Sequence, residues 1–586
     1  MAALLALVCF LNIIPVLALS RQPGFSWKES PLVLNAYGNG AVYYDARIRE
    51  VKDGFPLLGN PWFLEHNQKI APAFLAADWL QALPLIFGAS FEFTLVFGLL
   101  FWSFVFVFLA YLILMELINS RGVSVAGAAL SYFSVYSLML GPVSMQIVFP
   151  FLLFFLLAFL LWLKDHNSSP KMIFLIIASA CSFYIYTYLW QAALTVLLLT
   201  LIFLLFIKKW KQAVNLLAVI ALSVALAIPL IIFTFKQVAQ PDYWETMTRI
   251  GFIFTRWPAA EAYYSGRWIF VMLILWALLW RWIKPLRHYD NYLRAFTFFA
   301  LSGIGFEIVS LSNVLTGKEL ELAGHMVRFI TVWLMLAFTA ILFFAWQGRA
   351  ELKNLKPLQK IICIFLLIIS FWGVWQYARP YFSMVRIMAA DSSAQNIANL
   401  SRPLEWLENN VSEPAVVWAN YQERINSYVP ILTKHYVLFD GDGVLNFISN
   451  DEAEERYLTA GYMNNLTQKD IEREYSLYAG IGNGIHPYKI HNRKVKLCRL
   501  LYLNKIGYNC GELTDATLLK GKEYFSNLYQ RYIREVKPNI NAELQKFRVA
   551  YIVKDKNKIV DFKPENFDGA TLVYQDQFFL IYHLNQ

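Results

Sequence analysis

The chain has 586 residues, of which 58% are hydrophobic, 17% aromatic and only 16% charged, whereas a soluble protein carries about 25% charged residues. This composition excludes a wholly soluble protein. The net charge is +10, but the segment from Arg379 to the C-terminus balances 25 basic against 24 acidic residues, so the excess belongs to the apolar part and does not indicate nucleic-acid binding.

Apolar runs follow one another through the first two thirds of the chain, and each is about long enough to cross a bilayer core of about 30 Å. The first run lacks a basic start, so we expect a membrane helix rather than a secretory signal. The predicted fold is a polytopic α-helical membrane domain with about 11 transmembrane helices over residues 1–378, followed by a C-terminal α/β domain over 379–586. The predicted spans are residues 2–19, 91–118, 123–140, 143–163, 172–190, 192–207, 213–235, 267–283, 294–313, 326–346 and 361–378.

The charges between these spans predict the orientation. Five connectors on one side hold 14 Lys and Arg residues against three acids, whereas the opposite turns at Gly141-Pro142 and Trp190-Gln191 hold none. Because basic connectors stay in the cytoplasm, we predict a cytoplasmic N-terminus in the plasma membrane. The C-terminal domain then lies outside, as do residues 20–90, 236–266 and 314–325.

The first external segment, residues 20–90, is too long to be a simple connector. It contains Tyr43-Tyr44-Asp45-Ala46-Arg47-Ile48-Arg49, then Asn60-Pro61-Trp62 and Glu65-His66. One interpretation makes Asp45 the N-cap of a helix, paired with Arg49 one turn later. The other makes it a carboxylate just above the lipid headgroups that removes a proton from an acceptor hydroxyl. The two are compatible.

This order of parts resembles the glycosyltransferase C superfamily, many-span enzymes that take sugars from polyprenyl-phosphate donors. The shared features are a first span, a long external loop with an early acid and an Asn-Pro-Trp segment, many further spans and a terminal α/β domain. The resemblance implies that Asp45 is the catalytic base or a metal-associated acid. It also implies inversion at the sugar, and partners that are a polyprenyl-phosphate-linked sugar, the lipid bilayer and a glycan, lipid or protein acceptor.

The next external turn, residues 138–146, departs from that pattern because it has no acid, whereas several branches of the superfamily place a second acid there. No cofactor is therefore predicted. A divalent cation stays an open alternative, with only scattered oxygen ligands such as Glu65 and Asp53 to hold it.

A second group of candidates lies at the start of the tenth span. His325 and Arg328 are three residues apart and share a helix face, at the depth of a lipid phosphate. Arginine can stabilise the charge on a departing phosphate. Interfacial anchoring of Arg328 and a helix-start role for His325 are the alternatives. Further phosphate- or substrate-binding candidates are Arg47, Arg49, Glu65 and His66.

Glu307 lies inside the ninth predicted span, where a carboxylate is costly unless it faces protein or water. We consider two roles for it. It either lines a cavity, or it is protonated and hydrogen-bonded to a neighbouring helix.

The tail alternates short β-type runs, at 415–419 and 549–553, with polar helical stretches such as 451–458. It ends on a predicted hairpin of 570–574 with 578–582. Asp440-Gly441-Asp442-Gly443 is predicted to be a turn rather than a calcium loop. Cys498 and Cys510 either form a disulfide or are two free buried thiols.

We therefore expect a membrane glycosyltransferase with Asp45 as base. Two alternatives remain at this point: a transporter or flippase of lipid-linked saccharides, and a non-catalytic membrane scaffold. A transporter would need polar residues spread through the spans or a duplicated half, neither of which the sequence shows.

Overall fold

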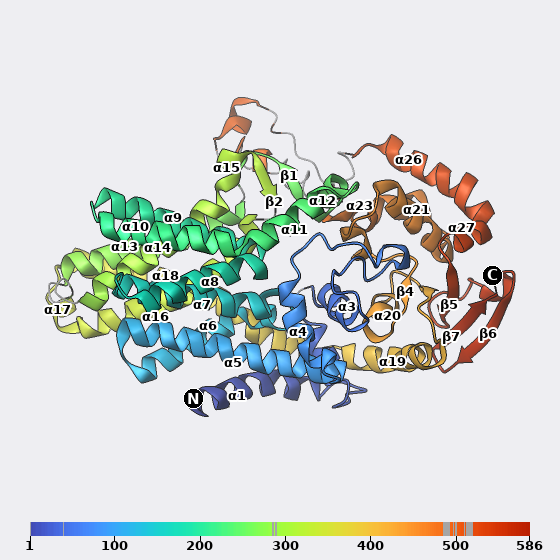
Figure 1. Cartoon of the computed structure of the whole chain (residues 1–586), viewed down its shortest axis with the longest axis horizontal. Coiled ribbons are helices and arrows are strands. Elements are labelled where there is room, and N and C mark those ends of the chain that lie inside the picture. Colours follow the sequence, from blue (N-terminus) through green and yellow to red (C-terminus); the bar gives the residue numbers. More distant parts are fainter. Residues whose placement is uncertain are drawn as a thin grey trace.

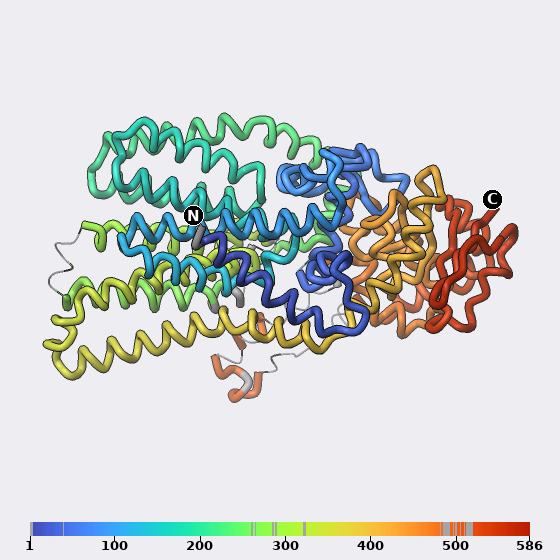
Figure 2. The backbone as a smooth tube through the Cα atoms, turned by 90° about the horizontal axis from the view of Figure 1, so that it is seen from below, coloured from blue at the N-terminus to red at the C-terminus, as the bar shows by residue number. Residues whose placement is uncertain are grey.

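The computed structural model describes residues 2–38, 40–258, 260–283, 286, 290–320, 322–484, 493–495, 497–498, 501–508, 510 and 520–585. Apolar helices lie side by side at one end of the molecule, and the C-terminal domain lies at the other end (Figure 1). The view from below shows the same two parts (Figure 2).

The eleven predicted runs coincide largely with helices, because each run is apolar along its length. The run 172–190 is interrupted at Tyr186, and the run 213–235 is interrupted at Ala227. These helices are α1 (Ala2–Leu19), α5 (Phe91–Ile118), α6 (Arg121–Met139), α7 (Ser144–Lys164), α8 (Ser169–Ile185), α9 (Thr187–Phe206), α10 (Trp210–Leu226) with α11 (Ile228–Val238), α13 (Ala260–Trp282), α14 (Asp290–Ser310), α16 (Leu322–Gln347) and α18 (Pro357–Ala390). Short α17 (Arg349–Lys353) precedes α18.

Among the described residues, seven helices are long and apolar enough to cross a membrane, or eight if the bent pair α10 and α11 is one span. Helices α1 and α8 are apolar but shorter, so the count of eleven spans stays a prediction. The bend of 51° between α10 and α11 lies at Pro229, whose ring cannot continue the hydrogen-bond ladder. The turn predicted at Trp190-Gln191 instead lies at Tyr186, which is extended.

The loop segments 20–90, 236–266 and 314–325, which the sequence predicts to lie on one side of the membrane helices, do lie on one side. The first contains α2 (Ser30–Asn35), α3 (Ala41–Lys52), η1 (Leu64–His66) and α4 (Ala76–Ile86); the others contain α12 (Tyr243–Ile250), β1 (Phe252–Phe254), α15 (Ser312–Thr316) and β2 (Lys318–Leu320). Strands β1 and β2 pair in antiparallel fashion, which joins two loops that are distant in sequence.

All three segments also contact the C-terminal domain. Arg49 pairs with Glu408, and Glu319 pairs with Arg493. The buried Arg249 guanidinium donates to the carbonyls of Val444, at 2.8 Å, and Ile448. The C-terminal domain and these loops therefore lie on one side of the helices, while the identity of that side as the exterior stays a prediction.

The C-terminal domain is α/β, as predicted. Its sheet has the order β4-β3-β5-β7-β6, with β3 parallel to β4 and β5 and the last hairpin antiparallel. The strands are β3 (Val416–Trp418), β4 (Tyr436–Val437), β5 (Val549–Asp555), β6 (Ala570–Gln575) and β7 (Phe579–Leu584). The predicted boundary at residue 378 falls inside α18, which continues to Ala390.

The C-terminal domain also contains helices, and the predicted helix at 451–458 is confirmed within α21. They are α19 (Ser393–Asn410), α20 (Arg424–Leu432), η3 (Gly443–Leu445), α21 (Asn450–Ala460), η4 (Gly461–Asn464), α22 (Gln468–Arg473), α23 (Tyr475–Gly484), η5 (Leu503–Ile506), α26 (Lys522–Arg531), η6 (Tyr532–Val536), η7 (Lys537–Asn539), α27 (Ile540–Lys546) and η8 (Pro564–Asn566). Helices α20 and α27, with η8, contact the sheet.

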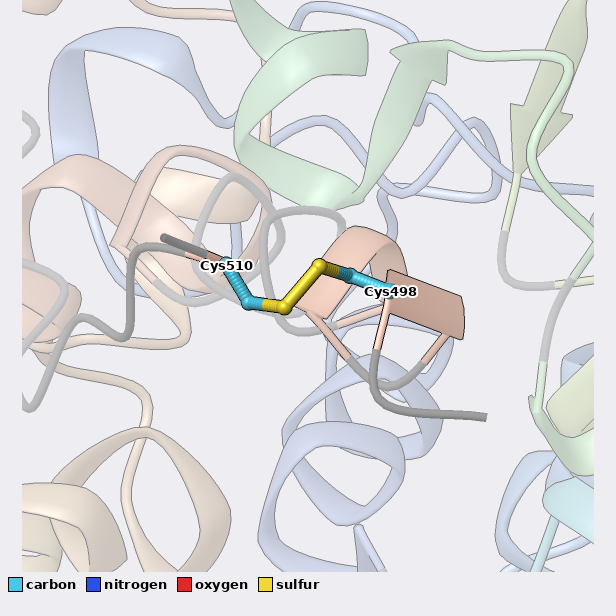
Figure 3. Close-up of a disulfide and its surroundings, with 2 residues drawn as sticks. All are labelled: Cys498 and Cys510. Carbon is cyan, nitrogen blue, oxygen red and sulfur yellow. A yellow bond between two sulfur atoms is a disulfide. The ribbon is translucent and has the colours of Figure 1, made fainter. Parts of the chain in front are cut away.

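Cys498 and Cys510 form a disulfide, which decides between the two alternatives left open by the sequence (Figure 3). The bond joins residues 12 positions apart. Cys9, Cys181 and Cys363 are free, and all three lie in apolar helices.

Candidate functional site

Asp45 lies inside α3 and not at its start. The helix is preceded by Gly40, whose positive φ of 67° suits a residue without a side chain. The predicted N-cap role and the predicted pairing of Asp45 with Arg49 are therefore wrong. Arg49 instead pairs with Asp53, one turn later, and with Glu408 of α19.

The Asp45 carboxyl is buried, with 2% of the residue exposed. One of its oxygens accepts a hydrogen bond from the Asn35 side chain of α2, and the other oxygen has no donor. Burial raises the pKa of Asp45 well above its usual value, and the Asn35 hydrogen bond opposes this only in part. Burial and the charge of Asp45 raise the pKa of Tyr428, which places α20 beside this acid.

Besides the Asp45 oxygen, the side-chain oxygens of Asn35 and Gln146 are buried without a hydrogen-bond donor. Both residues line a small cleft of about 20 Å³, which has room for one water-sized group, against apolar side chains of α5. This cleft gives a hydroxyl group access to Asn35, the hydrogen-bond partner of Asp45, but Asp45 itself does not line it.

The opposite face of α3 carries a buried ion pair. The Arg47 guanidinium donates two hydrogen bonds to the Asp78 carboxylate of α4, at 2.8 and 2.7 Å, and neither side chain is exposed by more than 2%. Asp78 does not figure among the residues chosen from the sequence. The sequence feature that could have identified Asp78 is that it is an acid within the otherwise apolar helix α4.

These residues line a cavity of about 80 Å³ where the membrane helices meet the loop of residues 20–90. Its polar walls are Tyr43, Tyr44, Arg47 and Asp78 from the loop and Ser144, Tyr186 and Thr187 from α7 and the α8–α9 turn. Asp45 is not among the lining residues. The Tyr43 ring stacks on Trp62, with centroids 5.5 Å apart, so the Asn-Pro-Trp segment holds one wall of the cavity in place.

His325 and Arg328 of α16 lie next to this cavity without being among its lining residues, because His325 contacts Tyr186, which lines it. The Tyr186 hydroxyl contacts Nδ1 of His325, whose ring stacks on Tyr188 at 4.2 Å. Arg328 also donates to Nδ1 of His325, at 3.4 Å. Because arginine is always a donor, Nδ1 is the acceptor, and the neutral ring carries its proton on Nε2.

The charge of Arg328 also acts on the loop of residues 20–90. Burial raises the pKa of Tyr44 to about 12, and the charges of Arg47 and Arg328 oppose this rise. Arg47 of α3 lines the cavity and His325 of α16 contacts its wall through Tyr186, whereas Asp45 does not line it.

A groove of about 420 Å³ adjoins this corner along α9. Its walls are apolar residues of α9 and α14, including Leu194, Leu198 and Ile308, and its rim carries Lys318 and Thr316. The Arg256 guanidinium lies near the same rim, beside Gly317. The groove therefore combines an apolar wall with a cationic edge.

Glu65 and His66 lie in a different place, at the contact between η1 and the C-terminal domain. Arg456 of α21 donates to Glu65 at 2.7 Å and to Glu452 at 2.8 Å, and the His66 ring contacts Glu452 at 2.8 Å. Burial favours a higher pKa for Glu452, but His66 and Arg456 hold that pKa down to about 2. This cluster attaches η1 to α21.

Glu452→Gln is therefore expected to destabilise the protein at neutral pH by about 1 kcal/mol. Because the pKa of Glu452 is lower in the folded than in the unfolded protein, its carboxylate stabilises the fold above the unfolded-state pKa of about 4.3. This stabilisation is lost as the pH falls toward the folded-state pKa of about 2. Thermal unfolding of both proteins between pH 7 and pH 2 checks this. A difference that stays constant over that range would contradict the assignment.

Glu307 lies in α14, and its carboxylate packs against Gly266 of α13. One carboxylate oxygen is buried without a donor. Among the described residues, no group of three or more His, Cys, Asp or Glu side chains is placed to hold a metal ion. A bound divalent cation has no further support from these residues.

Comparison with solved structures finds chains that are similar to this one. No protein-family model and no curated protein matches the chain. The apo oligosaccharyltransferase of Archaeoglobus fulgidus is 12% identical, with 94% of this chain and 69% of that chain aligned and a TM-score of 0.44. Apo ArnT of Cupriavidus metallidurans is 10% identical, with 99% and 97% aligned and a TM-score of 0.46.

A second structure of ArnT, bound to undecaprenyl phosphate, is 11% identical over 74% of this chain and 84% of that chain, with a TM-score of 0.42.

Proposed function

We propose that this chain is an integral membrane glycosyltransferase that moves a sugar from a polyprenyl-phosphate donor to an acceptor on the outer face of the plasma membrane. The observation that carries the proposal is the arrangement at the start of α9. There, His325 and Arg328 lie beside the polar cavity that Tyr186 lines, and an apolar groove with a cationic rim begins at Trp190 of the same helix. The apolar groove can hold the prenyl chain of the donor, and the cations at its rim can bind the donor phosphate.

Asp45 is the proposed base, and the acceptor hydroxyl donates its proton to the oxygen of Asp45 that has no donor. The acceptor oxygen then bonds to the anomeric carbon as the bond from that carbon to the phosphate oxygen breaks. The electron pair leaves with the polyprenyl phosphate. Inversion at the sugar comes from the superfamily resemblance.

Arg328 and the protonated Nε2 of His325 are the proposed donors to the departing phosphate, because charge develops on it as the bond breaks. Arg47 and Arg49 are less suited to this role. The Arg47 guanidinium is held by Asp78, and that of Arg49 is held by Asp53 and Glu408.

The test is a transfer assay in proteoliposomes with radiolabelled polyprenyl-phosphate sugars, in which release of free polyprenyl phosphate is measured. Arg328→Ala is expected to lower kcat by about 10²–10³-fold. Arg294→Ala, at the far end of α14, is the control and should keep wild-type activity. Movement of the intact lipid-linked sugar across the bilayer without phosphate release would favour the transporter alternative.

A further inference from the structure

The C-terminal domain contains a further cleft, of about 790 Å³. Helix α27, which contributes to its lining, lies at the end of the molecule away from the membrane helices (Figure 1). The cleft lies between η4, the corner of η7 and α27, and the connection from β5 to β6. Phe562 and Phe567 form its floor and pack on Trp418, with ring centroids 5.3 and 5.6 Å apart. The volume is in the range of small-molecule sites, about 300–1,000 Å³.

The charged residues of this cleft are mostly cations. Lys537, Lys558 and Lys563 line it, together with a single acid, Asp561. Lys537 donates to the Asn465 side chain at 2.7 Å. Lys558 and Lys563 are exposed, and within the described part of the chain neither ammonium has a hydrogen bond or ion pair.

The charge of Lys558 also acts on Glu423, which lies behind it and is buried. Burial raises the pKa of Glu423 to about 7, so this carboxyl is about half ionised at neutral pH and offsets the positive charge only in part. With three lysines against Asp561, the cleft keeps an excess of positive charge, and such a site selects an anion.

The uncharged polar groups of the cleft are amides. Asn464, Asn465, Asn541 and Asn566 line it beside the half-buried Tyr462. The Asn464 amide is held by a reciprocal pair of hydrogen bonds with Asn420, at 3.0 and 3.1 Å. Asn541 donates to Asp568 at 3.2 Å, and Asn465 accepts from Lys537. Each amide nitrogen keeps a second hydrogen and each amide oxygen a second lone pair, and these can pair with the hydroxyl groups of a sugar.

We propose that this cleft binds an anionic saccharide, a sugar chain that carries carboxylate or phosphate groups. Its hydroxyls pair with the asparagine amides, and its anionic groups lie against Lys558 and Lys563. A neutral saccharide would leave the two ammonium groups without partners. An apolar peptide would leave the amides unsatisfied. The proposal is independent of the reaction at the membrane helices.

The test uses the full chain in detergent micelles, with three fluorescent probes: tetragalacturonate, a phosphorylated mannotetraose and neutral maltotetraose. Fluorescence anisotropy is expected to show binding of at least one anionic probe, at least about tenfold tighter than maltotetraose and weakened by salt. Replacing Lys558 and Lys563 together by Gln should weaken that binding by about tenfold or more.

Lys522→Gln is the matched control, because Lys522 is an exposed lysine on α26 that does not line the cleft. It should leave binding unchanged. Binding of neither anionic probe, equal binding of the neutral probe, or equal losses in the control and the double variant would each overturn the proposal. Because binding is measured without turnover, the binding result can be interpreted even if the transfer assay shows no activity.

Discussion

Asp45→Asn is expected to lower the rate of sugar transfer by about 10²–10⁴-fold and to leave the protein folded. Asparagine has the same shape and can still accept from Asn35, but it cannot take a proton from the acceptor hydroxyl. Because burial raises the pKa of Asp45, the folded state already favours an uncharged group there. The unfolding temperature should therefore stay the same or rise, as transfer is lost.

The pH dependence gives a second readout of the same assignment. Asp45 acts as a base only when it is ionised, so kcat/KM should fall as the pH drops through its raised pKa, above the usual aspartate range. Asp53→Asn, at the end of the same helix, is the control and should keep activity. If Asp45→Asn retained wild-type transfer in proteoliposomes, another group would have to be the base.

Asp78→Ala is expected to cost about 3–5 kcal/mol of stability, the largest effect on folding that we predict. The substitution leaves the Arg47 guanidinium buried without its carboxylate. Replacing both partners by apolar residues, with Arg47→Met and Asp78→Leu together, should recover most of that loss, because no buried charge remains.

Both effects are measured by chemical or thermal unfolding in detergent, monitored by tryptophan fluorescence. Glu116→Ala serves as the control, since Glu116 forms an exposed pair with Lys164 and should change stability by less than about 1 kcal/mol. A stable Asp78→Ala single variant would contradict the structural role. A stable double variant without transfer activity would instead assign Arg47 to phosphate binding.

Some site residues could be chosen from the sequence because their chemistry shows in their position. An acid in a long external loop, and a His and an Arg three residues apart at the start of a span, stand out against apolar surroundings. The partners of these residues could not be chosen in this way. Asp78 is 31 residues from Arg47, and Tyr186 is 139 residues from His325, so only the packed helices bring them together.

The sequence by itself determined the membrane class, the positions of the apolar helices and the hairpin that ends the chain, because hydrophobic length and alternation are local properties. Only the tertiary structure decided which side chains meet. Asp45 pairs with Asn35 rather than Arg49, and Glu65 and His66 contact the C-terminal domain rather than the cavity. Burial and pairing depend on contacts between distant segments, and no local pattern records them.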